Sequence, residues 1–278
     1  MLSMKNTQSQ KASVFRTLHE RKGAFIMPNP WDAGTAKLLT ALGFEALATT
    51  SLGVSSSLGR PDGAGVVSRR ELLDNCAAIA AATHLPVNAD LENCYAHEPR
   101  AAAETIRLAA EAGVVGGSIE DATGNEDKPI YDFQLAVERV QAAVEMARSL
   151  DFPFVLTARA ENFLHGRRDL DDTIRRLQAF EKAGADVLYA PGLKDLATIR
   201  TVASSVSRPI NVVVGMLDPG ISAEDLAQAG VRRISIGGAL CKLALAHMLK
   251  GARETKEHGT FNWMAEVVPT AELRKIFS

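Results

Sequence analysis

The chain has 278 residues, a formal net charge of -2 at pH 7 and 46% hydrophobic residues. This hydrophobic share is enough for a large core, so the composition argues against an intrinsically disordered chain. The near-zero charge provides no attraction toward nucleic acid or an anionic lipid surface, and neither is expected as a partner. No uninterrupted apolar run approaches the length that crosses a bilayer, which argues against a membrane-spanning protein.

The N-terminus and the cysteines predict a cytoplasmic protein. Residues 1–10 are polar and contain no apolar run of the kind found in a secretory signal. Cys76, Cys94 and Cys241 are odd in number and show no Cys-x-x-Cys spacing. This pattern fits a reducing compartment better than a disulfide framework or a zinc site.

Short apolar runs alternate with helical patterns from the N-terminus onward. A lead-in segment over residues 1–22 contains a predicted helix at 11–21. Apolar residues at helical spacing predict further helices, for example from Phe133 to Ala147 behind an N-cap at Asp132. Gly113, Gly184 and Gly230 are expected to end helices in the left-handed conformation. Eight strands are predicted, at residues 25–27, 46–49, 86–89, 117–119, 154–157, 186–189, 210–213 and 233–236.

Eight strands that alternate with helices predict a parallel sheet, and the number eight favours a closed (β/α)8 TIM barrel over residues 1–278. An open doubly wound sheet is the alternative. It is less favoured because residues 28–32 read Pro-Asn-Pro-Trp-Asp where a Gly-x-Gly-x-x-Gly turn would stand. Long loops are expected at 51–68 and 122–131, and the apolar segment 254–278 is predicted to contact a neighbouring subunit.

Carboxylates follow several of the predicted strands. Asp90 and Glu92 come after the third strand and Glu120 after the fourth, while Asp62 lies in the loop after the second. The C-terminal ends of barrel strands share one edge, so these groups should surround a common mouth. Carboxylates without a neighbouring His or Cys suit Mg²⁺, or Mn²⁺, better than zinc.

An arginine and an amide are expected at the same mouth. Arg159 ends the fifth strand and Asn211 lies in the seventh. A guanidinium facing a divalent ion makes a site for a small 2-oxo acid, because the arginine can bind its carboxylate and the ion can stabilise its enolate.

These residues resemble the isocitrate lyase/phosphoenolpyruvate mutase superfamily from about residue 21 to 251. The motifs that carry the resemblance are the segments 28–34, 50–53, 57–63, 90–95, 118–121 and 157–163. The superfamily's metal motif usually reads Asp-x-Asp-x-Gly-Tyr-Gly, and the same frame here is Asp90-Leu-Glu92-Asn-Cys94-Tyr95-Ala96. We therefore expect Cys94 to be a packed replacement for a glycine.

The resemblance implies roles for individual residues. Asp90 should bind Mg²⁺ directly, and Asp62, Glu92 and Glu120 should hold its waters. Arg159, Glu120 and Asp62 are expected to take part in catalysis. The carboxylate and oxo group of the substrate should be bound by Thr50, Ser51, Leu52, Gly53, Arg159 and Asn211. The resemblance also implies a last helix exchanged between subunits of a homodimer or homotetramer.

Two departures from the superfamily limit the reaction. Its isocitrate-type lyases carry a catalytic cysteine in a Lys-Lys/Arg-Cys-Gly-His loop after the fourth strand, but residues 122–129 contain neither Cys nor His. Its phosphonate-handling mutases have a histidine after the sixth strand, where this chain has Tyr189-Ala-Pro-Gly. The general acid or base is left open among Tyr95, Lys128 and Glu161.

The sequence thus favours an Mg²⁺-dependent enzyme that cleaves a C–C bond, as a lyase or decarboxylase, in a small 2-oxo or 2-hydroxy dicarboxylate. Phosphonopyruvate hydrolysis or phosphoenolpyruvate mutase-type P–C chemistry is the alternative among enzymes. A non-catalytic 2-oxo acid-binding protein is the alternative from another class.

Overall fold

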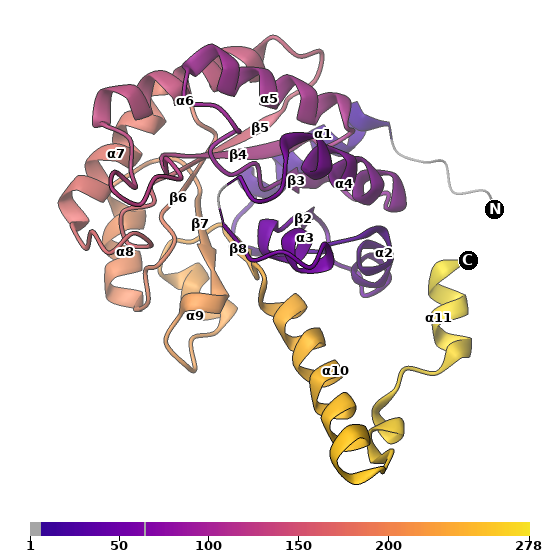
Figure 1. The fold of residues 1–278 in the computed structure, drawn as a ribbon. Coiled ribbons are helices and arrows are strands. Elements are labelled where there is room, and N and C mark those ends of the chain that lie inside the picture. Colours follow the sequence, from indigo (N-terminus) through magenta and orange to yellow (C-terminus); the bar gives the residue numbers. More distant parts are fainter. Residues whose placement is uncertain (1–6, 64) are drawn as a thin grey trace.

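The computed structural model of the protein describes residues 7–63 and 65–278. It is a barrel of parallel strands surrounded by helices, with a C-terminal arm that projects from it (Figure 1). The strands are β1 (Phe25–Met27), β2 (Leu47–Ala48), β3 (Val87–Ala89), β4 (Gly116–Glu120), β5 (Val155–Arg159), β6 (Val187–Tyr189), β7 (Ile210–Val213) and β8 (Arg233–Ser235).

The α-helices of the barrel are α1 (Gln8–Glu20), α2 (Ala33–Ala41), α3 (Ser51–Ser57), α4 (Arg69–Ala82), α5 (Pro99–Glu111), α6 (Phe133–Arg148), α7 (Leu170–Ala183), α8 (Leu196–Ser204) and α9 (Ala223–Gln228). A 3-10 turn, η1 (Val214–Met216), follows β7. The arm consists of α10 (Ala239–His258), η2 (Asn262–Glu266) and α11 (Thr270–Phe277).

The strand order closes the sheet into a barrel. Neighbouring strands pair in the order β1-β8-β7-β6-β5-β4-β3-β2, and every pairing is parallel. Between the two end strands, the Ala48 amide donates a hydrogen bond of 3.0 Å to the Pro28 carbonyl. The predicted (β/α)8 barrel is therefore confirmed, and the open doubly wound sheet is excluded.

Local sequence signals account for most element boundaries. Gly113, Gly184 and Gly230 have φ values of 92°, 105° and 96°, so each takes the left-handed conformation that favours glycine at a helix end. Two details differ from the prediction. Residues 51–57 form helix α3 within the expected loop. Asp132 makes no side-chain cap, because its carboxylate accepts a 2.7 Å bond from Lys128 instead.

Helix α1 packs across the barrel end at which the strands begin. Ala12 and Phe15 of α1 are fully buried against Met27, Val115 and Val155 from three strands. The predicted helix at 11–21 is thus observed slightly earlier, because Thr7 and Gln10 form a capping box that starts it at Gln8. Residues 1–6 of the predicted lead-in segment lie outside the described residues.

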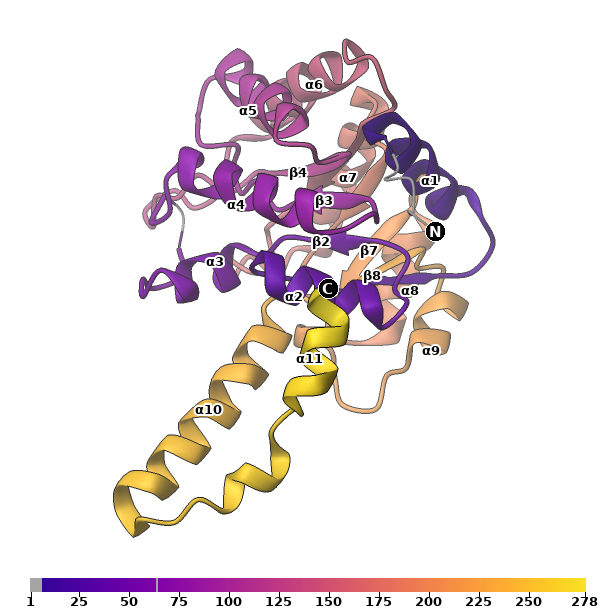
Figure 2. The same cartoon turned by 90° about the vertical axis from the view of Figure 1, so that its right-hand side faces the viewer.

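The arm leaves the barrel after β8 and returns to it. Helix α10 projects outward, and α11 comes back to lie against α2 (Figures 1 and 2). Lys37 Nζ of α2 donates a 2.9 Å hydrogen bond to the Phe277 carbonyl. The Trp263 ring packs on Gly251 of α10, and its Nε1 donates to Thr255 Oγ1 at 3.0 Å. The arm therefore has a defined internal structure outside the barrel. Within residues 7–63 and 65–278, no helix is both long and apolar enough to cross a membrane.

Candidate active site

The C-terminal ends of β3, β4 and β5 bring three charged side chains together. Arg159, the last residue of β5, donates from Nη1 to Asp90 Oδ1 at 2.9 Å. Its Nη2 lies 3.3 Å from Glu120 Oε2, and its Nε donates to Glu161 Oε1 at 2.8 Å. The Arg159 side chain is only 14% exposed, so one largely buried guanidinium pairs with three carboxylates: Asp90 directly after β3, Glu120 at the end of β4 and Glu161 just after β5.

The segment after β2 lies against Asp90. The Asp90 amide donates to Thr49 Oγ1 at 2.9 Å, and the Ser51 amide donates to Asp90 Oδ2 at 3.2 Å. Leu52 and Gly53, which are also predicted to bind substrate, pack closely against other segments and so hold the backbone of α3 in place. A Cβ on Gly53 would lie 2.6 Å from Trp31 Cβ, and Leu52 packs against Gly238. The structure therefore brings Ser51 to Asp90 as predicted, through its backbone amide.

The predicted metal segment adopts an unusual backbone. Glu92, Cys94 and Tyr95 have φ values of 49°, 60° and 57°, in the left-handed region that non-glycine residues rarely occupy. Cys94 is fully buried, as expected for a packed replacement of glycine. Glu92 accepts hydrogen bonds from the Tyr95 hydroxyl at 3.1 Å and from the Gly65 amide at 3.3 Å. Such local strain persists only where surrounding contacts enforce it.

Arg139 of α6 supplies such contacts. Its guanidinium is 1% exposed and donates to the carbonyls of Asn93, Ala96 and His97, with Nη2 2.5 Å from the first and Nη1 2.7 Å from the last. Its Cζ lies 4.3 Å from the centre of the Tyr131 ring, and burial lowers its pKa. Arg139 is thus a positioning residue for the loop that carries Glu92. This role could not be predicted from the sequence, because Arg139 stands within a helical pattern, away from any strand end.

The site contains more carboxylates than cationic side chains. Burial, followed by repulsion from Asp90, raises the pKa of Glu92 to about 7. Burial also raises the pKa of Glu120 well above its usual value; Arg159 opposes this, while Glu161, Asp90 and Glu92 add to it. Burial alone would lower the pKa of Arg159, but Glu161, Glu120 and Asp90 raise it well above the usual value. The site is therefore short of positive charge.

Asp62 is the most open member of the set. Partial burial and the nearby Asp90 raise the pKa of Asp62, and Lys242 of α10 opposes the shift. Sequence reasoning did not single out Lys242, because it lies in the helix after the last strand rather than at a strand end.

These residues fit a hard divalent ion in donor type and in charge. The carboxylates of Asp62, Asp90, Glu92 and Glu120 supply oxygen atoms, which Mg²⁺ and Mn²⁺ prefer. A divalent cation would also offset the repulsion that, after burial, helps to raise the pKa values of Asp62, Glu92 and Glu120. Within the described part of the chain, no three His, Cys, Asp or Glu side chains lie close enough together to hold a metal ion. Arg159 instead occupies the position between Asp90 and Glu120.

Asp121, which follows Glu120, and Asn211, which is expected at the mouth, are both engaged in other contacts. Asp121 is 3% exposed, pairs with Arg176 at 3.0 Å and accepts a 2.7 Å bond from the Glu161 amide. Asn211 lies inside the barrel, where it accepts from Arg233 Nε at 2.8 Å and donates to Ser235 Oγ at 3.1 Å. A role for Asn211 in substrate binding therefore stays a prediction.

The three residues left open as general acid or base all have partners. The Tyr95 hydroxyl donates to Glu92, Glu161 pairs with Arg159, and Lys128 pairs with Asp132 at 2.7 Å while its side chain is 60% exposed. A fourth residue that can donate a proton, Tyr189, also lies next to Arg159. Its ring centre lies 5.0 Å from Arg159 Cζ.

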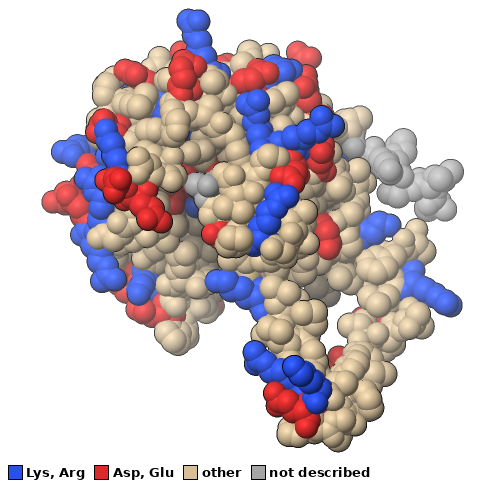
Figure 3. Space-filling model, in the orientation of Figure 1, with Lys and Arg blue, Asp and Glu red and all other residues tan. Residues whose placement is uncertain are grey.

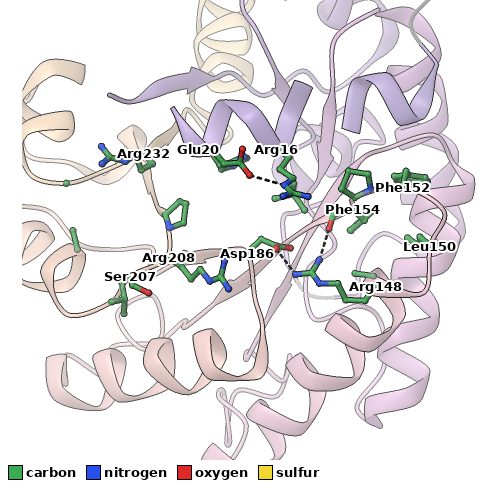
Figure 4. Close-up of a pocket in the computed structure, with 18 of the residues that line it drawn as sticks. Arg16, Glu20, Arg148, Leu150, Phe152, Phe154, Asp186, Ser207, Arg208 and Arg232 are labelled. Atoms are coloured by element: carbon green, nitrogen blue, oxygen red, sulfur yellow. Dashed lines mark hydrogen bonds and ion pairs between the residues drawn. The ribbon is translucent and has the colours of Figure 1, made fainter. Parts of the chain in front are cut away.

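A cavity of about 970 Å³ lies at the opposite end of the barrel, between α1 and the segments that precede β5, β6 and β7 (Figure 4). Four of its charged side chains form two ion pairs, Arg16 with Glu20 and Arg148 with Asp186. It contains none of the residues predicted for the site. The constellation around Arg159 is therefore the candidate active site.

Known proteins resemble this chain over nearly its whole length. The model of the phosphoenolpyruvate phosphomutase family matches residues 15–256. An uncharacterized protein of Mycobacterium tuberculosis (strain ATCC 25618 / H37Rv) is 30% identical over 261 residues, covering 94% of each chain. The 2-methylisocitrate lyase of Escherichia coli (strain K12) is 29% identical over 227 residues, which cover 78% of this chain and 75% of the lyase.

Solved structures agree with the sequence matches. A candidate lyase/mutase from Burkholderia cenocepacia J2315 is 55% identical, with a TM-score of 0.95 and coverage of 98% of this chain and 96% of that one. Oxaloacetate acetylhydrolase in complex with its product oxalate is 25% identical, with a TM-score of 0.87 and coverage of 98% and 94%.

Proposed function

The chain belongs to the phosphoenolpyruvate phosphomutase family, within the isocitrate lyase/phosphoenolpyruvate mutase superfamily of enzymes, and from this premise we propose its reaction. The proposed reaction is Mg²⁺-dependent cleavage of a C–C bond in a small 2-oxo or 2-hydroxy dicarboxylate, through an enolate. The observation that carries the proposal is the pairing of Arg159 with Asp90 and Glu120 in a site that is short of positive charge.

Each proposed role follows from the chemistry of the side chain. Asp90 would bind the ion directly, and Asp62, Glu92 and Glu120 would hold its waters. The bound ion would supply positive charge to the oxygens of the substrate. Arg159 has a planar fork that suits a substrate carboxylate, and the Ser51 amide is a second donor at the same place.

The names of several relatives support C–C rather than P–C cleavage. The similar curated proteins include 2-methylisocitrate lyases, an oxaloacetate decarboxylase of Ectopseudomonas mendocina and a 2,3-dimethylmalate lyase of Eubacterium barkeri. The absence of Cys and His from residues 122–129 argues against an isocitrate-type acid in this loop. A dicarboxylate, rather than a tricarboxylate such as isocitrate, is therefore the preferred substrate class.

The test is incubation of the purified protein with Mg²⁺ and a panel of 2-oxo and 2-hydroxy dicarboxylates, with proton NMR detection of pyruvate, oxalate or glyoxylate. Phosphonopyruvate, followed by phosphorus NMR, belongs in the same panel. Release or rearrangement of phosphorus without C–C cleavage would favour the P–C alternative. Calorimetric binding of oxalate with Mg²⁺, but no product from any compound, would favour a non-catalytic binding protein.

The C-terminal arm supports self-association. Leu243, Met248 and Leu249 of α10 are 55%, 60% and 45% exposed, and Phe261 and Met264 beyond it are 59% and 54% exposed. Figure 3 shows a cluster of charged side chains at the tip of the arm and basic side chains near its two ends, with mostly uncharged surface between them. A second copy of the chain would cover this apolar surface, with residues 254–278 and α10 exchanged in a dimer or tetramer. The three buried, free cysteines support a cytoplasmic location.

A further inference from the structure

Tyr189 lies beside Arg159 at the C-terminal end of the barrel strands. It is the last residue of β6, in register with Arg159 on one side and with Asn211 on the other. Side chains in register on neighbouring parallel strands point to the same face, so Tyr189 faces the barrel interior as Arg159 does. Its side chain packs beneath the Arg159 guanidinium, and the residue is 9% exposed.

The Tyr189 hydroxyl has no hydrogen-bond partner among the described residues. Buried phenols normally have one. The Tyr189 oxygen is nevertheless not one of the fully buried side-chain atoms that lack a partner. In the described chain these atoms are Asn75 Oδ1, Asn88 Oδ1, Arg139 Nε and Asn162 Oδ1. This oxygen is therefore accessible to solvent although most of its residue is buried. Since Tyr189 ends its strand at the mouth, the accessible space is the mouth of the barrel.

The surroundings favour a proton donor that can carry a transient negative charge. Burial raises the pKa of Tyr189, which keeps the phenol protonated near neutral pH, while Arg159 and Arg233 act in the opposite direction. The hydroxyl of the other phenol at the site, Tyr95, donates a hydrogen bond to Glu92. Tyr189 is thus the phenol whose proton is available to a ligand.

We propose that Tyr189 is the catalytic acid that protonates the enolate carbon after the C–C bond is cleaved. This rests on the proposed function. In the step, the phenolic O–H bond breaks and its proton forms a C–H bond with the electron pair of the enolate C=C bond. The enolate oxygen becomes the carbonyl of the 2-oxo acid product. The positive charges of Arg159 and Arg233 stabilise the phenolate, which regains a proton from water at the mouth.

The step can be tested without the natural substrate. By microscopic reversibility, the same oxygen exchanges the methyl protons of pyruvate with solvent, which proton NMR measures in D₂O with Mg²⁺. Tyr189→Phe keeps the ring and removes the hydroxyl. Its exchange rate should fall by about 100-fold or more, because general acids contribute on the order of 10²–10⁴. Calorimetric binding of oxalate with Mn²⁺ should stay within about twofold of wild type, since Arg159 and the carboxylates are retained.

Ser13→Ala is the control for removal of a hydroxyl. The Ser13 hydroxyl donates to the Ser9 carbonyl at 3.0 Å on the exposed side of α1, at the opposite end of the barrel, and the variant should exchange pyruvate protons like wild type. Exchange by Tyr189→Phe at the wild-type rate overturns the assignment and leaves the proposed function standing. Loss of exchange together with loss of oxalate binding also overturns it, because the role would then be structural. If wild type neither exchanges pyruvate nor cleaves any acid of the panel, the proposed function and the assignment both fail.

Discussion

Arg159 and Asp90 form an ion pair of 2.9 Å that joins the end of β5 to the residue after β3. The pair is mostly removed from solvent, with side chains 14% and 20% exposed. Asp90 is the residue for which direct metal binding is proposed, and Arg159 is the one proposed to bind substrate. A divalent ion and a substrate carboxylate would therefore each separate this pair, so the binding of one is expected to favour the binding of the other.

Replacing Arg159 should lower the free energy of unfolding, because the carboxylates around it would repel one another. Arg159→Gln leaves Asp90, Glu120 and Glu161 without their common cation. Removing one partner of a buried ion pair typically costs about 3–5 kcal/mol, so the free energy of unfolding should fall by about that much at neutral pH. Added Mg²⁺ should restore part of the loss. Urea denaturation with and without Mg²⁺ measures both effects.

An exposed pair provides the control for this variant. Arg60 pairs with Glu71 at 2.9 Å, with side chains 39% and 36% exposed. Arg60→Gln should leave the free energy of unfolding nearly unchanged and insensitive to Mg²⁺. Equal losses for the two variants, or no recovery of Arg159→Gln with Mg²⁺, would contradict the view of a site short of positive charge.

Asp90→Asn should abolish metal-dependent ligand binding while the fold remains intact. The asparagine keeps an oxygen for the Ser51 amide but lacks the charge that a divalent ion requires. Removing one negative charge also relieves the repulsion that raises the pKa of Glu92. Calorimetry should detect no oxalate binding in the presence of Mn²⁺, and the circular dichroism spectrum should match wild type. Asp132→Asn, on the exposed pair with Lys128, should bind like wild type. Normal metal binding by Asp90→Asn would refute the site assignment.

The barrel and the acidic mouth could be predicted from sequence because both depend on local patterns. Apolar runs of strand length predicted the eight strands. The carboxylates directly after two of them predicted that Asp90, Glu92 and Glu120 lie at the same end of the barrel. Arg139 and Tyr189 could not be recognised in the same way. Arg139 turns inward to meet carbonyls some forty positions away in the chain, at separations of 42 to 46 residues. Only the barrel register places Tyr189 beside Arg159.

Helix α3 could not be predicted because its local composition indicates a loop. The segment Ser51–Ser57 contains four serines and a glycine, which have poor helix propensity. It is helical because tertiary contacts outweigh that propensity. Gly53 lets the helix approach Trp31, and Val54 is 2% exposed in the core. The same packing directs the Ser51 amide at Asp90.

A charge on α10 should separate the proposed subunits. Met248 is 60% exposed in a single chain, whereas a dimer that exchanges this helix would bury it. Met248→Glu should therefore shift the protein from dimer or tetramer to monomer, because an unpaired buried carboxylate is costly. Size-exclusion chromatography with light scattering measures the mass. Glu257→Gln, on the exposed C-terminal turn of the same helix, serves as the control. A wild-type monomer would contradict the proposal for the arm.

His19 predicts how stability responds to acid. The residue is 7% exposed, its Nδ1 lies 2.8 Å from the Phe15 carbonyl, and its Nε2 lies 3.5 Å from Arg233 Nη1. A ring between a carbonyl acceptor and a guanidinium is favoured in its neutral form, with the proton on Nδ1. Burial, with a further contribution from Arg233, lowers its pKa to about 3. An unfolded chain has the ordinary value, so acid protonates the unfolded state first.

The contribution of His19 is therefore complete above the unfolded pKa of about 6.5 and is lost as the pH falls toward the folded value. Between about pH 6.5 and about pH 5 this group alone should reduce the free energy of unfolding by about 2 kcal/mol, at about 1.36 kcal/mol per pH unit. Urea denaturation at a series of pH values measures the slope. His19→Gln cannot take up the proton, so its slope should be smaller by this amount whatever its absolute stability. Equal slopes for variant and wild type would mean that His19 titrates alike in the folded and unfolded chains.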